Sequence, residues 1–121
     1  MPGSNQPNLG LRAGWTDGDN DWGAADSGGG MNANLRRLDA LVMSAVEDKD
    51  LTAPPGSPVD GARYIVKATA TGAWATHEKA IAVWNGVSSA WDFYAPKEGW
   101  ITWVKDEDVM YVYNGTSWGA L

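Results

Sequence analysis

The stretch IAVWNGVSSAW (Ile81–Trp91) and the shorter MYVYNGTSW (Met110–Trp118) follow the same pattern. In each, apolar and aromatic residues alternate, an Asn-Gly pair follows, and a tryptophan comes a few residues later. Alternation is typical of a β-strand with one buried face, and Asn-Gly between two such strands is a strong hairpin signal. The two stretches therefore predict two β-hairpins of the same design in one chain.

The similarity extends upstream of both hairpins. A Pro-x-x-Gly pattern precedes a strand ending in Val-Lys, first from Pro58 and again from Pro96, and a nine-residue insertion around KATATGAWA lengthens the first copy. We therefore predict a mainly β protein with a small antiparallel module at 58–121, built from two related units at 58–91 and 96–118. The predicted strands are 62–67, 80–84, 90–94, 100–105 and 109–113.

Residues 31–49 form the helical stretch that the sequence predicts. Its apolar side chains recur at spacings of four, three, four and three residues, the seam of a coiled coil: Met31, Leu35, Leu38, Val42 and Ala45. One interpretation is a helix packed on the chain's own sheet. The other is a short parallel bundle that joins copies of the chain, most simply as a homotrimer. We favour the bundle, because the small β module has little face to spare.

The helix is flanked by two segments of unusual composition. Residues 50–57 are rich in proline and predict a stiff, extended linker. Residues 1–30 are rich in Gly, Asn and Asp, and such a segment cannot bury enough apolar surface to fold alone. We predict an extended arm whose large apolar residues anchor it in pockets of another protein: Leu9, Leu11, Trp15 and Trp22.

Composition excludes several classes of function. The chain of 121 residues has a net charge of −6 and no cysteine, so neither nucleic-acid binding nor a thiolate metal site is expected. No run is apolar enough for membrane insertion, and no secretion signal is visible, so we expect synthesis in a cytoplasm. DGDNDWG (Asp17–Gly23) resembles a calcium loop only superficially, because Trp22 and Gly28 stand where glycine and glutamate are required. We expect no cofactor.

The aromatic residues beside the hairpins are the strongest candidates for a binding site: Trp84, Trp91, Tyr113 and Trp118. Exposed rings could stack on sugars, which would make the chain a carbohydrate-binding module for a host surface glycan. The structural alternative is that a chain poor in long aliphatic residues uses these rings as its core, each burying about 150–250 Å². A third and weaker possibility is an enzyme centred on His77, but no nucleophile motif accompanies it.

Several blocks together resemble a known family: NANLRRLDALV, ATGAWATHEKAIAVWNG and WDFYAPKEGW, in that order. It is a domain of unknown function carried by alphaproteobacterial phages, prophages and gene-transfer-agent clusters, and the resemblance covers about Asn32 to Trp118. It implies a non-enzymatic virion protein in the proximal part of a head spike or tail fibre. Its partners would be a capsid, neck or tail protein, and a distal fibre protein or host glycan.

The order of segments agrees with that implication. Because only Gly-Ala-Leu follows Trp118, we expect a base or adaptor and not a complete adhesin. It would be attached to the particle through residues 1–30 and self-assembled through Met31–Val46.

Overall fold

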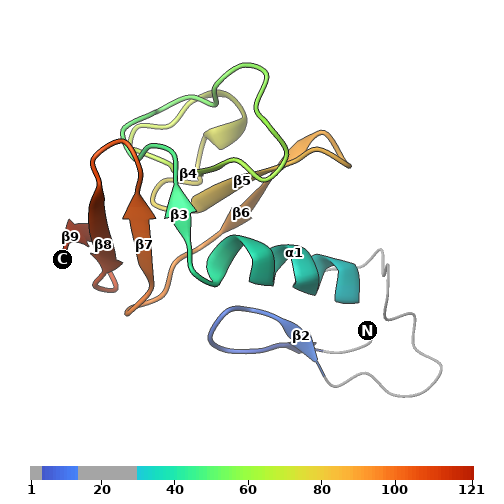
Figure 1. Cartoon of the computed structure of the whole chain (residues 1–121). Helices are drawn as coiled ribbons and strands as arrows, with labels where there is room; N and C mark the ends of the chain where they lie inside the picture. Colours follow the sequence, from blue (N-terminus) through green and yellow to red (C-terminus); the bar gives the residue numbers. More distant parts are fainter. Residues whose placement is uncertain (1–3, 14–29) are drawn as a thin grey trace. The chain divides into compact units, whose positions relative to one another are not determined.

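The computed structural model describes residues 4–13 and 30–121 (Figure 1). The predictions for Trp15, Trp22 and the acidic stretch at Asp17–Gly23 lie outside these residues. The chain divides into two compact units, Met1–Val42 and Met43–Leu121. The larger unit holds seven short strands, so the predicted mainly β class is confirmed.

The described part of the smaller unit is a hairpin and a helix. The strands β1 (Ser4–Asn5) and β2 (Arg12–Ala13) pair antiparallel, and the helix α1 covers Met31–Leu41. The guanidinium of Arg37 donates a hydrogen bond to the carbonyl of Leu9 at 3.2 Å. Residues 4–13 therefore fold back on themselves and are held to the helix, where the sequence predicted a continuous extended arm.

The predicted helix end at residue 49 is wrong. Val42 is already extended (φ −80°, ψ 125°), and Met43 adopts a left-handed conformation with φ 54°. The strand β3 (Ala45–Val46) follows and pairs parallel with β7 (Ile101–Val104), so Ala45 is not part of a helical seam. Valine suits a strand better than a helix, and pairing with β7 decides between the two.

Two sheets make up the larger unit. The first is antiparallel and contains β4 (Arg63–Ile65), β5 (Ile81–Asn85) and β6 (Ala90–Tyr94). The second has the order β3-β7-β8-β9, with β8 at Val109–Tyr113 and β9 at Trp118–Ala120. The five predicted strands are confirmed to within two residues at each end, whereas β9 was predicted only as the tryptophan after a turn.

The internal repeat is visible in the strand register. Arg63 pairs with Val83 in the first sheet, and the corresponding residues Ile101 and Val112 pair in the second. Backbone hydrogen bonds agree as well. The N–H of Gly61 donates to the carbonyl of Trp84 at 2.8 Å, and that of Gly99 donates to Tyr113 at 2.8 Å. Thus β4-β5-β6 and β7-β8-β9 are two copies of one three-stranded unit.

Both Asn-Gly turns are stabilised in the same way. The side-chain oxygen of Asn85 accepts hydrogen bonds from the backbone N–H groups of Val87 and Ser88, at 3.0 and 3.2 Å. The Asn114 oxygen accepts the equivalent bonds from the second and third residues after it, at 2.8 and 2.9 Å. The asparagine side chain thus satisfies two turn donors, which is why this residue precedes glycine in both copies.

One extended segment, residues 44–51, joins the two sheets. The N–H groups of Trp103 and Lys105 donate to carbonyls of residues 44 and 46, at 3.0 and 2.9 Å. Those of Ile65 and Lys67 donate to carbonyls of residues 48 and 51, both at 3.1 Å. The segment therefore runs beside the first strand of each repeat, and Figure 1 shows β3 between β7 and β4.

The Pro-rich stretch does not separate two bodies as predicted. The whole of residues 50–57 belongs to the larger unit, and the unit boundary falls at Val42. The carbonyl of Thr52 accepts a hydrogen bond from the N–H of Thr71 at 2.8 Å, which ties the start of this stretch to the loop between β4 and β5. The prolines stiffen a loop on the module surface.

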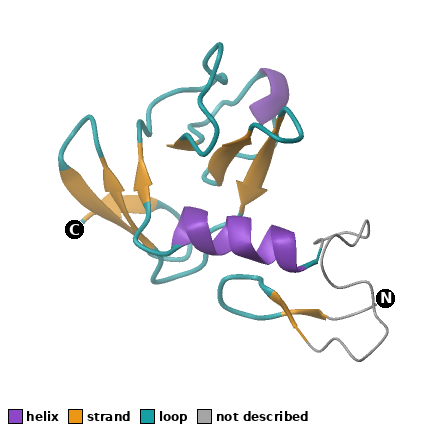
Figure 2. Cartoon of the chain, turned by 45° about the vertical axis from the view of Figure 1, so that its right-hand side comes forward, coloured by secondary structure: helices purple, strands orange, loops and turns teal. Residues whose placement is uncertain are grey.

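The insertion in the first repeat supplies part of the core. It forms a loop with the short 3-10 helix η1 (Gly72–Trp74), which lies beside the first sheet in Figure 2. Trp74 is completely buried and packs with Val66 and Ala82. Its ring also meets the rings of Tyr64 and Trp91, with centroids 5.7 and 5.3 Å away. This tryptophan is the centre of the cluster.

Replacing Trp74 with alanine should lower the free energy of unfolding by about 3–5 kcal/mol, as expected for a fully buried aromatic residue. Trp74→Phe should cost much less, because an aromatic ring is retained and the buried indole N–H has no hydrogen-bond partner to lose. Urea denaturation measures both, with Trp103→Ala as a control at a partly exposed position. Equal midpoints for wild type and Trp74→Ala would contradict this role.

Candidate interaction surface

The aromatic residues of the two hairpins are paired with each other inside the chain. Trp84 lies opposite Trp91, with ring centroids 5.2 Å apart and planes at 66°. Tyr113 lies opposite Trp118 in the same way, at 5.3 Å and 56°. Tyr113 is buried and the other three are half-buried. Each hairpin thus closes on one tilted or edge-on ring pair, in a favourable aromatic geometry.

Both pairs are tied into their surroundings. Trp91 also meets the ring of Tyr64 edge-on at 6.0 Å, in addition to its contact with Trp74. The indole N–H of Trp118 donates to the carbonyl of Lys79 at 2.8 Å. The structure therefore places the four candidate rings in two separate groups, and their packing favours the structural interpretation. Glycan binding through them stays a prediction.

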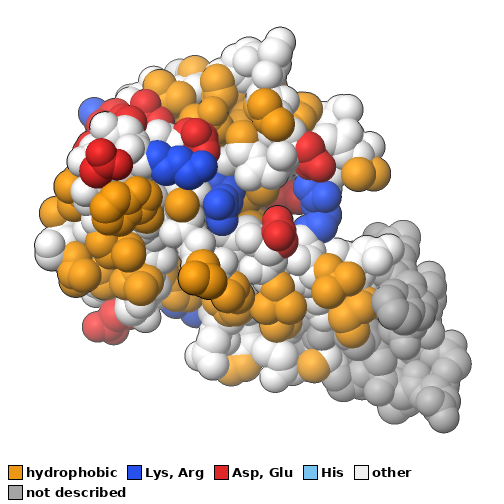
Figure 3. All heavy atoms as spheres, in the orientation of Figure 1, with side chains coloured by type: hydrophobic (Ala, Val, Ile, Leu, Met, Phe, Trp, Pro, Cys, Tyr) orange, Lys and Arg blue, Asp and Glu red, His pale blue; other side chains and the backbone are white. Residues whose placement is uncertain are grey.

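Within residues 43–121, the second sheet has one face that is only partly covered. Along β7, Ile101 and Trp103 are 53% and 37% exposed, whereas Thr102 and Val104 between them are completely buried. Register neighbours share a face, so other apolar residues of this sheet join the exposed side. We call this set the apolar sheet face: Ala45, Ile101, Trp103, Met110, Val112 and Leu121. In Figure 3, hydrophobic side chains gather over β7 and β8.

The same positions are buried in the first repeat. Trp103, Met110 and Val112 correspond to Ile65, Ile81 and Val83 by the strand register. The three first-copy residues are 4%, 1% and 5% exposed. The apolar sheet face therefore has the composition of a buried surface, but residues 43–121 cover it only in part. Of its residues only Ala45 was a predicted site residue. The pattern of ITWV offered a signal, because Ile101, Trp103 and Val104 place apolar side chains on both faces of one strand.

Charged side chains close one end of the sheets. Glu47-Asp48-Lys49-Asp50 continues β3, and Lys105-Asp106-Glu107-Asp108 turns from β7 into β8. The two runs match in charge: Lys105 pairs with Glu47 at 2.6 Å, and Lys49 pairs with Glu107 at 3.3 Å. These pairs align the two segments beyond the last parallel backbone hydrogen bond, although the exposed Lys105–Glu47 pair contributes little stability.

Several pKa values near this end are raised. Burial by itself lowers the pKa of Lys49, but hydrogen bonds and charge attraction from Asp50 and Glu107 raise it by more. The hydroxyl of Tyr111 donates to Glu107, and this bond, together with burial, raises its pKa. Burial and the nearby carboxylates of residues 47 and 48 raise the pKa of Tyr64.

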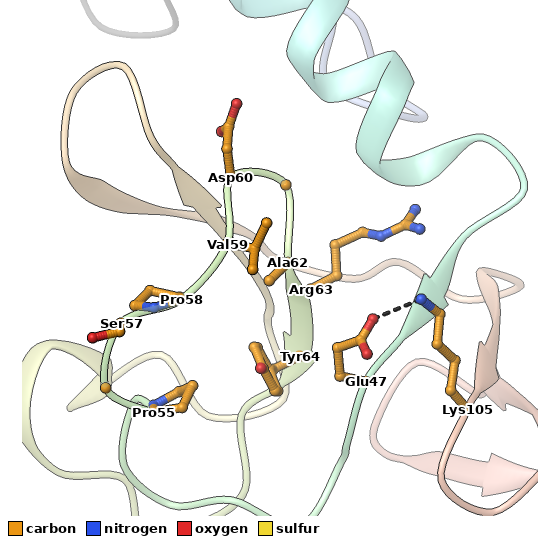
Figure 4. A pocket seen from close by; sticks show the side chains of 12 residues that line it. Glu47, Pro55, Ser57, Pro58, Val59, Asp60, Ala62, Arg63, Tyr64 and Lys105 are labelled. Carbon is orange, nitrogen blue, oxygen red and sulfur yellow. Dashed lines mark hydrogen bonds and ion pairs between the residues drawn. The ribbon is translucent and has the colours of Figure 1, made fainter.

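An open pocket of about 380 Å³ lies between the Pro-rich loop and β4 (Figure 4). Pro55, Pro58 and Tyr64 are among its lining residues, and the Glu47–Lys105 ion pair lies at its edge. Because that acid and base neutralise each other, the pair offers no net charge to attract a charged ligand. In the described part of the chain, no three His, Asp or Glu side chains are grouped closely enough to hold a metal ion.

His77 has a packing role in the loop of the first repeat. Its ring stacks on Phe93, with centroids 3.7 Å apart and planes at 2°. The neighbouring Glu78 accepts a hydrogen bond from the N–H of Ala70 at 3.0 Å. Backbone N–H groups, its own first and that of Ala70 next, lower the pKa of Glu78. The two residues hold the loop that carries Trp74, and a catalytic role for His77 has no support in this geometry.

Residues 43–121 define a class: a small β module of two repeats with one partly exposed apolar sheet face. Residues 31–119 match the family described as "protein of unknown function (DUF2793)", and the chain belongs to that family. This confirms the resemblance to an uncharacterised domain. No curated protein matches the chain. Within residues 4–13 and 30–121, no helix has the length and apolar character to span a membrane.

Alkaline pH should destabilise the larger unit. Lys49, Tyr64 and Tyr111 bind their protons more tightly in the folded protein than at their ordinary pKa values of 10.5 for lysine and 10.0 for tyrosine. The stability they contribute is therefore fully present below about pH 10 and is lost as pH rises through the folded pKa values. Urea midpoints measured from pH 8 to beyond 10 should fall. The urea midpoint of Tyr111→Phe should fall less steeply with pH than that of wild type. A wild-type midpoint independent of pH would contradict the stabilising role of these three protonated groups.

Proposed function

We propose that this protein is a structural component of a bacteriophage virion, the base or adaptor of a head spike or tail fibre. The observation that carries the proposal is the apolar sheet face, because exposed apolar patches of this kind mark protein–protein contacts. The sequence resemblance to a domain carried by phages supports the phage context. A protein that joins other proteins needs such a surface and needs no catalytic centre.

The smaller unit supports the same role. Leu35 is 53% exposed on α1, and with the half-buried Met31 and Leu38 it keeps the spacing of a helical seam. Part of an apolar stripe is therefore exposed on α1, which favours association of chains into a homotrimer, now without Val42 and Ala45, because both follow the helix end at Leu41. Leu9 and Leu11 are half-buried in the N-terminal hairpin. This leaves Trp15 and Trp22, outside the described residues, as the stronger candidates for anchoring in a capsid, neck or tail protein.

Deleting residues 1–25 should abolish binding to the particle and leave the β module folded, because the compact unit begins at Met43. Purified full-length and truncated chains would be incubated with particles that lack this protein, and bound chain would be measured after sedimentation. The Trp15→Ala/Trp22→Ala double variant keeps the full chain and should bind as weakly as the deletion. A deletion variant that sediments like wild type, or that loses its β-sheet circular dichroism, would refute the anchoring role.

Carbohydrate binding is the second candidate, favoured by the duplication of one half-buried ring pair in both hairpins. On a glycan array we expect no glycan to retain the protein, because the faces and edges of these rings already pack against each other. Trp118→Ala, with Trp103→Ala as the matched control, separates the two functions. A glycan signal that Trp118→Ala removes and Trp103→Ala keeps, with folding intact, would favour the carbohydrate-binding module.

A further inference from the structure

The two Asn-Gly pairs are chemically reactive groups that the proposed function does not use. In such a pair, the backbone nitrogen of glycine can attack the side-chain amide carbon of asparagine, because glycine has no side chain to hinder the approach. The chain has two of them, Asn85-Gly86 and Asn114-Gly115, at equivalent turns of the two repeats. Their reactive nitrogens differ in the hydrogen bonds that they make.

In the first repeat, carboxylates hold both nitrogens. The N–H of Gly86 donates to Asp60 at 2.8 Å, and the side-chain amide of Asn85 donates to Asp92 at 3.2 Å. Attack would make the amide carbon tetrahedral and move its nitrogen out of the bond to Asp92. Deprotonation of Gly86 would place a negative charge beside the Asp60 carboxylate, and like charges disfavour each other. Both bonds therefore oppose the reaction at Asn85, which is also half-buried.

In the second repeat, the amide nitrogen has no such partner. By the strand register, Asp92 opposite Val83 corresponds to Gly119 opposite Val112, and glycine has no side chain to accept a bond. Asn114 is exposed, and within residues 43–121 its side-chain NH₂ donates no hydrogen bond. No tertiary contact therefore opposes the change of geometry at this amide.

The attacking nitrogen of the second pair is not held either. Glu98 takes the place of Asp60, because each is the third residue of its Pro-x-x-Gly pattern. Glu98 lies beside the turn, with Oε1 3.9 Å from the place of an added Cβ on Gly115. Even so, the N–H of the exposed Gly115 donates to no group within residues 43–121. Its proton is therefore open to solvent.

The turn itself favours the attack. Oδ1 of Asn114 accepts two backbone N–H bonds at 2.8 and 2.9 Å, and this oxygen gains negative charge when the nitrogen adds to the amide carbon. Two donors at such distances stabilise the charge as an oxyanion hole does. The equivalent bonds to Asn85 are longer, at 3.0 and 3.2 Å.

We propose that Asn114 is a site of spontaneous deamidation and that Asp60 and Asp92 protect Asn85 from the same reaction. The nitrogen of Gly115 loses its proton and bonds to Cγ of Asn114. The bond from Cγ to Nδ2 then breaks, Nδ2 takes up a proton from water and leaves as ammonia, and a cyclic succinimide remains. Water opens the ring at either carbonyl, which gives aspartate or isoaspartate. Each event consumes one water, releases one ammonia and adds one carboxylate.

The modified turn lies where the two repeats touch. The ammonium of Lys79 donates to the carbonyl of Thr116, and the carbonyl of Lys79 accepts the indole N–H of Trp118. Aspartate at 114 keeps an oxygen for the two turn N–H groups. Isoaspartate carries the backbone through the former side chain and lengthens it by one carbon, so this product displaces Thr116 from Lys79.

Peptide mass spectrometry on the purified full-length chain tests the proposal. Trypsin gives residues 80–97 and 106–121 with one Asn-Gly pair each, and replacement of NH₂ by OH raises the mass of a peptide. At mildly alkaline pH, Asn114 in the folded chain should deamidate about ten times faster than Asn85, the factor that one lost hydrogen bond to a charged group implies. In denaturing urea the two rates should converge, because the protection comes from tertiary contacts. Equal rates in the folded chain, or a ratio that survives denaturation, would overturn the proposal.

A substitution at Gly119 gives a second readout. Gly119→Asp supplies the counterpart of Asp92, and apart from the chain neighbours of this glycine no atom lies within 4 Å of an added Cβ. Asn114 should then deamidate several times more slowly than in the matched control Gly119→Ala, which restricts the backbone equally but carries no carboxylate. Circular dichroism checks that both variants keep the β module. Equal rates in the two folded variants would contradict the protective role assigned to Asp92.

Discussion

Both sheets depend on the parallel hydrogen bonds made by residues 44–51. The carbonyls of this segment accept bonds from β7 on one side and from the β4 side on the other, four in all. Had the segment stayed helical, these four N–H donors would lose their partners, at about 1–3 kcal/mol for each one that is buried. Helix propensity differs among most residues by less than about 1 kcal/mol. Pairing therefore outweighs the local preference.

The shared segment makes equivalent contacts with both copies of the three-stranded unit, because it lies beside the first strand of each. The two copies have the same strand register and the same asparagine-stabilised turns. The backbone N–H groups of Gly61 and Gly99 also donate equivalent hydrogen bonds. Each copy closes on one aromatic pair, because large rings fill the space that a chain with few long aliphatic residues cannot otherwise fill. The insertion with Trp74 gives the first copy an additional buried cluster around that ring.

This asymmetry has a functional consequence. The first copy is buried at Ile65, Ile81 and Val83, whereas at the equivalent positions of the second copy Trp103 is 37% exposed and Met110 and Val112 are half-buried. Tryptophans of the larger unit therefore differ in role: Trp74 is core, Trp84 and Trp91 close a hairpin, and Trp103 is partly exposed. The same residue type that suggested a sugar site from sequence is used mainly for packing, and the surface most suited to a partner is aliphatic as well as aromatic.

The sequence by itself determined the mainly β class, the two Asn-Gly hairpins, the repeat and most strand positions, because alternation and turn chemistry act over a few residues. It also determined the start of α1 at Met31. Tertiary structure alone decided that Ala45 and Val46 form a strand, because their partners are nearly sixty residues away. It also decided that Trp84 and Trp118 are paired while Trp103 is open: all three are tryptophans in β-hairpins, and only the packing of distant segments determines which face of a strand is covered.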